Sequence, residues 1–156
     1  MLKECCDYLN IIEGSVYVDC TMGGGGHSRA ILERGGKVVG LDQDPDAIKK
    51  TSEALKTYID NNKFEIIQSN FRYIEDVIQK SKLLDGKLAD GVLMDLGISS
   101  YQIDQPTRGF AFGADGPLDM RMDYNVNKLT ASTIVNDWDV TRIADVLYNY
   151  GLIKHN

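Results

Sequence analysis

Residues 16–28, with the sequence VYVDCTMGGGGHS, constrain the fold more than any other stretch of the chain. The hydrophobic run at 16–20 predicts a buried strand, the glycines from Gly23 to Gly26 predict a tight turn, and the residues from His27 onward predict a helix. Glycine has no Cβ, so a ligand can approach this backbone closely, and the unpaired N–H groups at the start of the helix suit a carboxylate or a phosphate. The stretch therefore predicts a ligand site, although an ordinary strand–turn–helix corner would show the same pattern.

Strand and helix patterns alternate over the first part of the chain. Strands are predicted at 16–20, 37–41, 64–68 and 91–95, and helices at 3–10, 27–33, 45–58 and 73–81. This alternation predicts an α/β fold with a doubly wound, mostly parallel Rossmann-like sheet. The ligand crevice of such a sheet lies at the carboxyl ends of its strands, so we expect Asp19, the glycine turn, Asp42 and Asp95 to meet there.

The regular pattern stops between residues 96 and 123. Loops of this length are usually functional or disordered, and this one is too apolar for a solvated linker. We therefore predict an ordered, functional loop at 96–123, followed by helices at 129–136 and 141–150.

The composition excludes several classes of function. The three cysteines form no Cys-x-x-Cys pair and there are only two histidines, so we predict no metal site, no disulfide framework and no histidine-based hydrolytic triad. The net charge of −6 argues against a protein that grips nucleic acid with its whole surface, so any such contact must be local. No apolar run is long enough to span a membrane and the N-terminus is too acidic for a secretory signal, so we expect no membrane partner. The odd number of cysteines, two of them adjacent, predicts a reducing compartment.

The order of acids and glycines suits S-adenosylmethionine. Asp19 would bind the ammonium of its amino-acid end, directly or through water, and N–H groups of the turn that begins at Gly23 would bind its carboxylate. Asp42 would bind the ribose hydroxyls, and Phe71, which follows the third strand, would lie against the adenine. A nicotinamide-dependent oxidoreductase of the same fold is a weaker alternative, because Ser28 stands where the dinucleotide fingerprint has its third glycine.

Six segments resemble one family of methyltransferases: VDCTMGGGGHS, GLDQDPDAI, SNF, GVLMDLGISSYQID, RGFAF and DGPLDMRMD. This is the MraW-like (RsmH-like) family of bacteria and organelles, which modifies the N4 amine of a cytosine in small-subunit ribosomal RNA. The similarity covers about residues 4–151, and Tyr101 departs from it because the family usually has proline there. The resemblance implies S-adenosylmethionine as the cofactor, with contacts at Gly25, Gly26, His27, Asp42, Phe71, Asp95 and Gln102.

The resemblance also implies an attack of the cytosine N4 on the sulfonium methyl group, with much of the catalysis coming from the positioning of the two reactants. Asp95 is the candidate catalytic residue, as the polar contact near the reacting centre. The base must leave its stack, and Tyr101, Phe110 and Phe112 are candidates to stack on it; each could equally anchor the loop to the core.

Two arginines are candidate contacts to RNA phosphates, Arg108 and Arg121. The alternative is that they form salt bridges with nearby acids, namely Asp104, Asp115, Asp119 or Asp123.

The family pattern predicts the organisation of the chain. Residues 1–123 would form the cofactor-binding core with its active-site loop at 96–123, and residues 124–156 would begin a helical substrate-recognition domain. Family members continue beyond residue 151, so we expect an incomplete sheet of order 3-2-1-4, whose exposed fourth strand could support a homodimer.

The expected partner is small-subunit ribosomal RNA or the assembled small subunit. The expected location is the cytoplasm, with a mitochondrial or other organelle matrix as the alternative. The alternative function is a truncated, catalytically inactive member of the family that binds the cofactor or acts in an interaction.

Overall fold

The computed structural model describes residues 1–151. The chain forms two compact units, Met1–Ser99 and Ser100–Asn156. Residues 100–123, which the sequence assigned to the core, thus lie in the second unit, and the division into a cofactor-binding and a substrate-recognition domain stays a prediction.

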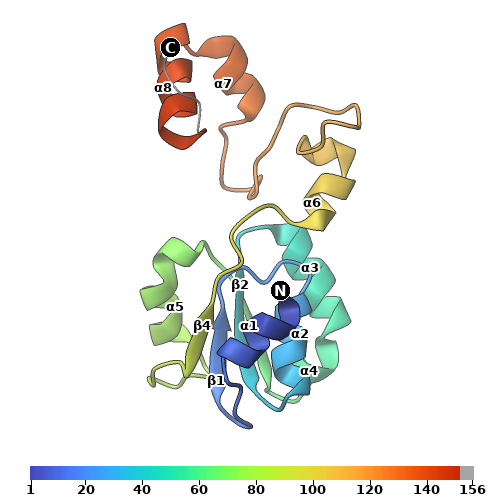
Figure 1. The fold of residues 1–156 in the computed structure, drawn as a ribbon, viewed down its shortest axis with the longest axis vertical. Coiled ribbons are helices and arrows are strands. Elements are labelled where there is room, and N and C mark those ends of the chain that lie inside the picture. The colour runs from blue at the N-terminus through green and yellow to red at the C-terminus, as the bar shows by residue number, and fades with distance from the viewer. Residues whose placement is uncertain (152–156) are drawn as a thin grey trace. The chain divides into compact units, whose positions relative to one another are not determined.

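A four-stranded sheet forms the centre of the first unit (Figure 1). Its strands are β1 (Val16–Asp19), β2 (Lys37–Asp42), β3 (Phe64–Gln68) and β4 (Gly91–Leu93). All pairs are parallel and the order is β3-β2-β1-β4, with Val18 opposite Val39 on one side and Val92 on the other. The predicted parallel α/β sheet and its strand order are confirmed.

Helices cover both faces of this sheet. They are α1 (Leu2–Tyr8), α2 (Gly26–Glu33), α3 (Pro45–Ala54), α4 (Lys56–Asp60) and α5 (Ile74–Lys80), with a 3₁₀ turn, η1 (Phe71–Tyr73), before α5. Successive residues of β1 point to opposite faces. Tyr17 joins a core with Ile31 of α2 and Leu55 at the end of α3, whereas Val18 joins a core with Val77 of α5. Figure 1 shows α5 on the other side of the sheet from α2 and α4.

The helix predicted at 45–58 is divided in two. It begins as predicted, with Asp44 accepting a hydrogen bond from the Asp46 N–H at 3.0 Å and with Pro45 at the first helical position. It is interrupted at Leu55, whose φ of −115° and ψ of 21° are not helical. The Leu55 side chain is buried, so the break directs an apolar group into the core beside the glycine turn.

The second unit consists of short helices joined by loops. Its elements are α6 (Ser100–Asp104), the 3₁₀ turn η2 (Pro106–Arg108), α7 (Ala131–Asp137) and α8 (Val140–Tyr150). The predicted loop therefore contains two helical turns. Thr130 caps α7 and Asp139 caps α8 through side-chain hydrogen bonds, and neither helix has a buried residue among those described.

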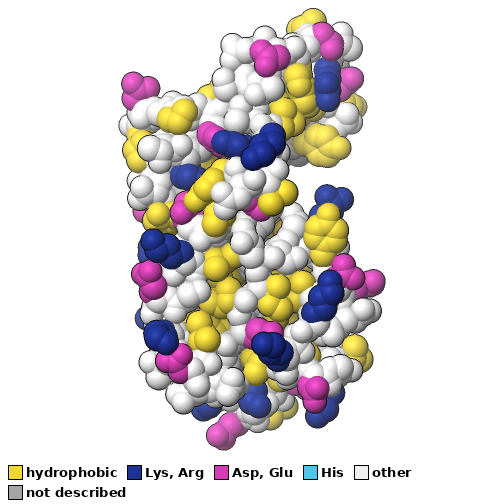
Figure 2. All heavy atoms as spheres, turned by 180° about the vertical axis from the view of Figure 1, so that it is seen from behind, with side chains coloured by type: hydrophobic (Ala, Val, Ile, Leu, Met, Phe, Trp, Pro, Cys, Tyr) yellow, Lys and Arg dark blue, Asp and Glu magenta, His cyan; other side chains and the backbone are white. Residues whose placement is uncertain are grey.

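Apolar side chains also reach the surface. Figure 2 shows hydrophobic groups between charged ones on the face that it displays. β4 is an outer strand of the described sheet, and Val92 and Met94 are 45% and 47% exposed. Among the helices of residues 1–151, none combines the length and the hydropathy that crossing a membrane requires.

Candidate cofactor site at the carboxyl edge of the sheet

The four glycines that follow β1 have two different structural roles. Gly23 and Gly25 have φ angles of 50° and 76°, in the left-handed region that glycine tolerates best. A Cβ at Gly25 would lie 2.7 Å from Cγ2 of Thr51, which is too close. A Cβ at Gly24 or Gly26 would meet nothing within 4 Å. The turn thus needs glycine at two positions to bend, and it presents open backbone at the other two.

Asp42, at the end of β2, is directly hydrogen-bonded to this turn. Its Oδ2 accepts from the Gly23 N–H at 2.7 Å, and its Oδ1 accepts from the Asp44 N–H at 2.9 Å. Burial raises the pKa of the Asp42 carboxyl. Each carboxylate oxygen keeps a lone pair that can accept a second hydrogen bond. The structure therefore brings together the glycine turn and the acid on which the predicted site depends.

Asp19, at the end of β1, is completely buried beneath the turn. The Ser28 hydroxyl donates to its Oδ2 at 2.7 Å, and the Thr21 N–H donates to its Oδ1 at 3.2 Å. Burial is the main cause that raises the pKa of Asp19. Its contact with the ammonium of a ligand stays a prediction, and the observed bonds give this carboxyl group a role in shaping the turn.

We expect the variant Asp19→Asn to gain stability relative to the parent chain as the pH rises. A carboxyl group with a raised pKa stabilises the fold most below its ordinary pKa, and this contribution falls as the pH rises toward the raised value, because only the unfolded chain ionises freely. Asparagine does not titrate, and its amide can still accept from Thr21 and donate to Ser28. Urea unfolding of both chains at about pH 4, pH 5.5 and pH 7.5 would measure the difference.

The control for this comparison is Asp60→Asn, because Asp60 is exposed and its carboxylate pairs with Lys56 on the surface. A pH-independent difference between Asp19→Asn and the parent chain would contradict the expectation.

Asp95 lies two residues beyond the end of β4, and a side chain holds it there. Its N–H donates to Oγ1 of Thr21 at 2.7 Å, which continues the contact between β1 and β4 past the last ladder pair. Oδ2 of Asp95 is 3.9 Å from Nδ1 of His27 in the first turn of α2. Nε2 of His27 is buried and has no hydrogen-bond partner among the described residues. The pair therefore offers a half-exposed carboxylate and an unsatisfied ring nitrogen beside the glycine turn.

Phe71 begins η1, directly after the loop that follows β3. It packs, partly buried, against the core on the α5 face of the sheet. The loop is fastened to the end of β2, because the Ser69 N–H donates to the Asp42 carbonyl at 2.9 Å and the Asn70 side chain donates to Gln43 at 3.0 Å. The structure thus places Phe71 in a segment that is bonded to Asp42 and its neighbour.

The other candidate residues belong to the second unit. Gln102 of α6 is buried, Tyr101 and Phe110 are half-buried, and Phe112 is fully exposed. The assignment of Gln102 to the cofactor and of the three aromatic residues to the base stays a prediction.

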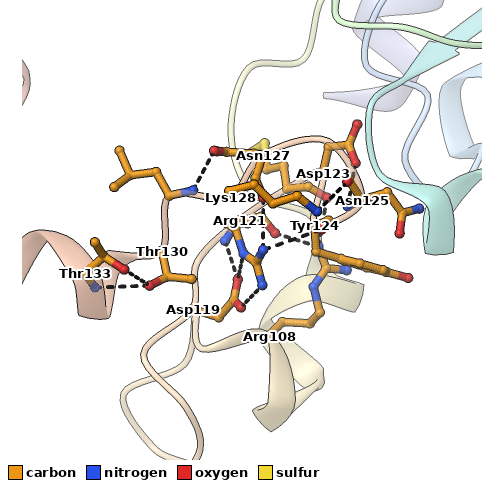
Figure 3. A network of polar contacts seen from close by, with 12 residues as sticks. Arg108, Asp119, Arg121, Asp123, Tyr124, Asn125, Asn127, Lys128, Thr130 and Thr133 are labelled. Carbon is orange, nitrogen blue, oxygen red and sulfur yellow. Dashed lines mark hydrogen bonds and ion pairs between the residues drawn. The ribbon is translucent and has the colours of Figure 1, made fainter.

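Arg108 and Arg121 both make contacts within the second unit (Figure 3). Arg121 forms two side-chain bonds to Asp119, from Nε at 2.9 Å and from Nη2 at 2.6 Å, and this guanidinium lowers the pKa of Asp119. Arg108 is buried, donates to the carbonyls of Arg121 and Met122, and lies 5.2 Å from the ring of Tyr124. The salt-bridge alternative therefore describes Arg121, and a phosphate contact for either arginine stays a prediction.

Three hydroxyl residues of the site were not identified from the sequence, namely Thr21, Ser28 and Thr51. Each makes one of the hydrogen bonds that hold the turn or an acid in place. The sequence carries a signal only for Thr51, a residue of modest helix propensity in the interior of a predicted helix. No group of three or more histidine, cysteine or acidic side chains among residues 1–151 is arranged to hold a metal ion.

The arrangement can bind a ligand that has an anionic end and a pair of hydroxyl groups. The open backbone at Gly24 and Gly26 leaves room for close approach, and the start of α2 favours an anion. Asp42 offers acceptors for hydroxyl groups. This donor set fits the amino-acid end and the ribose of S-adenosylmethionine.

Comparison with known proteins gives a consistent result. The chain matches the model of the MraW methylase family over residues 1–156. It is 45% identical over 154 residues to the "Ribosomal RNA small subunit methyltransferase H" of Clostridium botulinum (strain Kyoto / Type A2), covering 97% of this chain and 48% of that protein. It is 47% identical over 152 residues to the protein of the same name from Carboxydothermus hydrogenoformans, covering 97% and 47%. The chain thus spans about half the length of the curated relatives it matches.

Solved structures align less closely with this chain than these relatives do. The C-terminal domain of precorrin-6Y C5,15-methyltransferase from Rhodobacter capsulatus aligns with a TM-score of 0.49 and 20% identity, over 67% of this chain and 52% of that one.

Proposed function

Because the chain belongs to the MraW methylase family, we propose that it takes part in the transfer of a methyl group from S-adenosylmethionine to the N4 amine of a cytosine in small-subunit ribosomal RNA. The observation that carries this proposal is the 2.7 Å bond between Asp42 and the Gly23 N–H. It joins a hydroxyl-binding acid to an anion-binding turn in one site, as the two ends of this cofactor require.

The cofactor is S-adenosylmethionine, and it brings an activated methyl group on a sulfonium. The residues of this chain bind and orient it. The turn from Gly23 to His27 faces its amino-acid end, Asp42 accepts hydrogen bonds from its ribose, and Phe71 lies against its adenine. By the family resemblance, Gln102 of α6 is a further candidate contact.

Asp95 holds the reacting amine of the substrate. The lone pair of the cytosine N4 is delocalised into the ring, and a hydrogen bond from the N4–H to the Asp95 carboxylate favours a more pyramidal, more nucleophilic nitrogen. The backbone bond to Thr21 fixes the position from which this carboxylate acts. Much of the rate enhancement then comes from holding the two reactants about 3 Å apart.

The names of the relatives support ribosomal RNA of the small subunit as the substrate, either free or in the assembled subunit. Tyr101, Phe110 and Phe112 are the candidates to stack on the extruded base, and Arg108 and Arg121 are the candidate phosphate contacts. The relatives are bacterial proteins, which favours the cytoplasm over an organelle matrix.

We expect residues 1–156 to bind S-adenosylmethionine weakly, with a dissociation constant of roughly 10 µM to 1 mM. Calorimetric titration together with the thermal shift on adding cofactor measures this binding. The methyl transfer itself is tested with labelled cofactor and either free small-subunit RNA or assembled subunits, followed by nucleoside analysis for N4-methylcytidine. Asp95→Ala is the matched variant, which should lose transfer, and titrating it with cofactor separates the loss of a cofactor contact from the loss of the contact to the amine.

Each outcome of this experiment has a definite meaning. An absence of binding at millimolar cofactor would overturn the cofactor assignment, and a methylated nucleoside other than N4-methylcytidine would overturn the substrate assignment. Binding without transfer would favour the alternative function, in which residues 1–156 bind the cofactor but are catalytically inactive by themselves.

A further inference from the structure

Thr51 is a buried residue in the interior of α3 whose hydroxyl group leaves its own helix. It donates to the carbonyl oxygen of Gly23 at 2.8 Å. Threonine and serine inside helices commonly bond the carbonyl four residues earlier, and the adjacent Ser52 does so, donating to Ile48 at 2.7 Å. The hydroxyl group of Thr51 is therefore bonded to the glycine turn, whereas that of Ser52 is bonded to a carbonyl of its own helix.

Thr51 and Asp42 together hold Gly23 by both its backbone polar groups. The N–H of Gly23 is bonded to Asp42 at 2.7 Å and its carbonyl to Thr51 at 2.8 Å. The methyl group of Thr51 also fills the space that a side chain at Gly25 would need. The turn is consequently fixed by contacts from α3 as well as from the end of β2.

The bond to Thr51 also determines where the next N–H group points. The peptide between Gly23 and Gly24 is planar and trans, so its carbonyl and its N–H point in opposite directions. With the Gly23 oxygen directed toward α3, the Gly24 N–H is directed away from it. Gly24 is exposed, and within residues 1–151 no acceptor is bonded to its N–H. The turn thus presents the Gly24 N–H as a free donor on its open side.

We propose that Thr51 is a positioning residue that directs the Gly24 N–H toward the carboxylate of the cofactor. The inference rests on the proposed function, since it assumes that S-adenosylmethionine binds at this turn. A hydrogen bond to an ionised acceptor is stronger than one to a neutral acceptor, so the direction of this donor matters for affinity. Thr51 acts only through the peptide of Gly23 and does not itself contact the ligand.

The test separates the hydroxyl of Thr51 from its methyl group, and the amino-acid end of the ligand from the rest. Thr51→Val keeps the shape and removes the hydroxyl, Thr51→Ser keeps the hydroxyl, and Ser52→Ala removes a hydroxyl of the same helix that does not contact the turn. The ligands are S-adenosylhomocysteine and 5′-methylthioadenosine, which shares the ribose, adenine and sulfur but lacks the carboxylate and ammonium. Calorimetric titration gives both affinities for each chain.

We expect Thr51→Val to weaken S-adenosylhomocysteine about tenfold and to change 5′-methylthioadenosine by less than about twofold. Thr51→Ser should recover most of the affinity, and Ser52→Ala should match the parent chain. The ratio of the two affinities would not respond to a general loss of stability, which would act on both ligands.

Equal weakening of both ligands in Thr51→Val, or no weakening of either, would overturn the inference and leave the proposed function in place. A parent chain that binds neither ligand would overturn the proposed function, and the role of Thr51 with it.

Discussion

Replacing Asp42 with alanine is expected to weaken the binding of S-adenosylhomocysteine by at least about 100-fold. The change removes the acceptors for the ribose hydroxyls, and each hydrogen bond to a charged group contributes about 1.5–3 kcal/mol. It also releases the N–H groups of Gly23 and Asp44 that the carboxylate now holds. Calorimetric titration of the variant with S-adenosylhomocysteine and with adenosine should show a loss of both.

Asp42→Asn separates the effect of the lost charge from that of the lost hydrogen bond to Gly23. The asparagine oxygen can still accept from Gly23, but its NH₂ group cannot accept from Asp44, so we expect an intermediate loss of about tenfold. The control is Asp60→Ala, a change of an exposed acid that should leave the affinity unaltered. Binding by Asp42→Ala at the affinity of the parent chain would show that the ligand lies elsewhere.

Gly25→Ala is expected to lower the free energy of unfolding by about 2–5 kcal/mol. The left-handed φ of 76° costs a residue with a side chain roughly 1–2 kcal/mol. The added Cβ would lie 2.7 Å from Thr51 and 3.1 Å from Leu55, and overpacking of this kind typically costs a further 1–3 kcal/mol. Urea unfolding followed by circular dichroism measures the change.

Gly26→Ala provides the matched control for stability. This glycine has no positive φ, and its added Cβ would meet nothing within 4 Å, so the free energy of unfolding should change by less than about 0.5 kcal/mol. An equal loss of stability in both variants would mean that the turn does not have the described conformation.

Much of the first unit could be predicted because its signals are local. β3 has the predicted bounds at 64–68, and the start of α3 follows from the acid and the proline at Asp44 and Pro45. The parallel topology then brings Asp42 to the glycine turn, although the two lie 19 positions apart in the sequence and belong to different local patterns. The break at Leu55 could not be predicted, since the apolar stripe continues through it and neither glycine nor proline marks it.

The parts of the site that the sequence missed depend on contacts between distant residues. Thr21 reaches Asp95 across 74 positions and Thr51 reaches Gly23 across 28, and a hydroxyl group has neither charge nor periodicity to reveal its partner. The salt-bridge partner of Arg121 could not be predicted for a similar reason. Several acids lie near it in the sequence, and only the path of the loop selects Asp119.

The half-exposed Val92 of β4 and Met94, which follows this strand, affect how this protein should be handled in solution. Copies of a chain with a net charge of −6 repel one another, but this repulsion extends only about 10 Å at 0.1 M salt. Added salt weakens it and leaves the attraction between apolar strand edges intact. Dilute samples at low ionic strength are therefore the conditions in which a titration reports ligand binding and not aggregation.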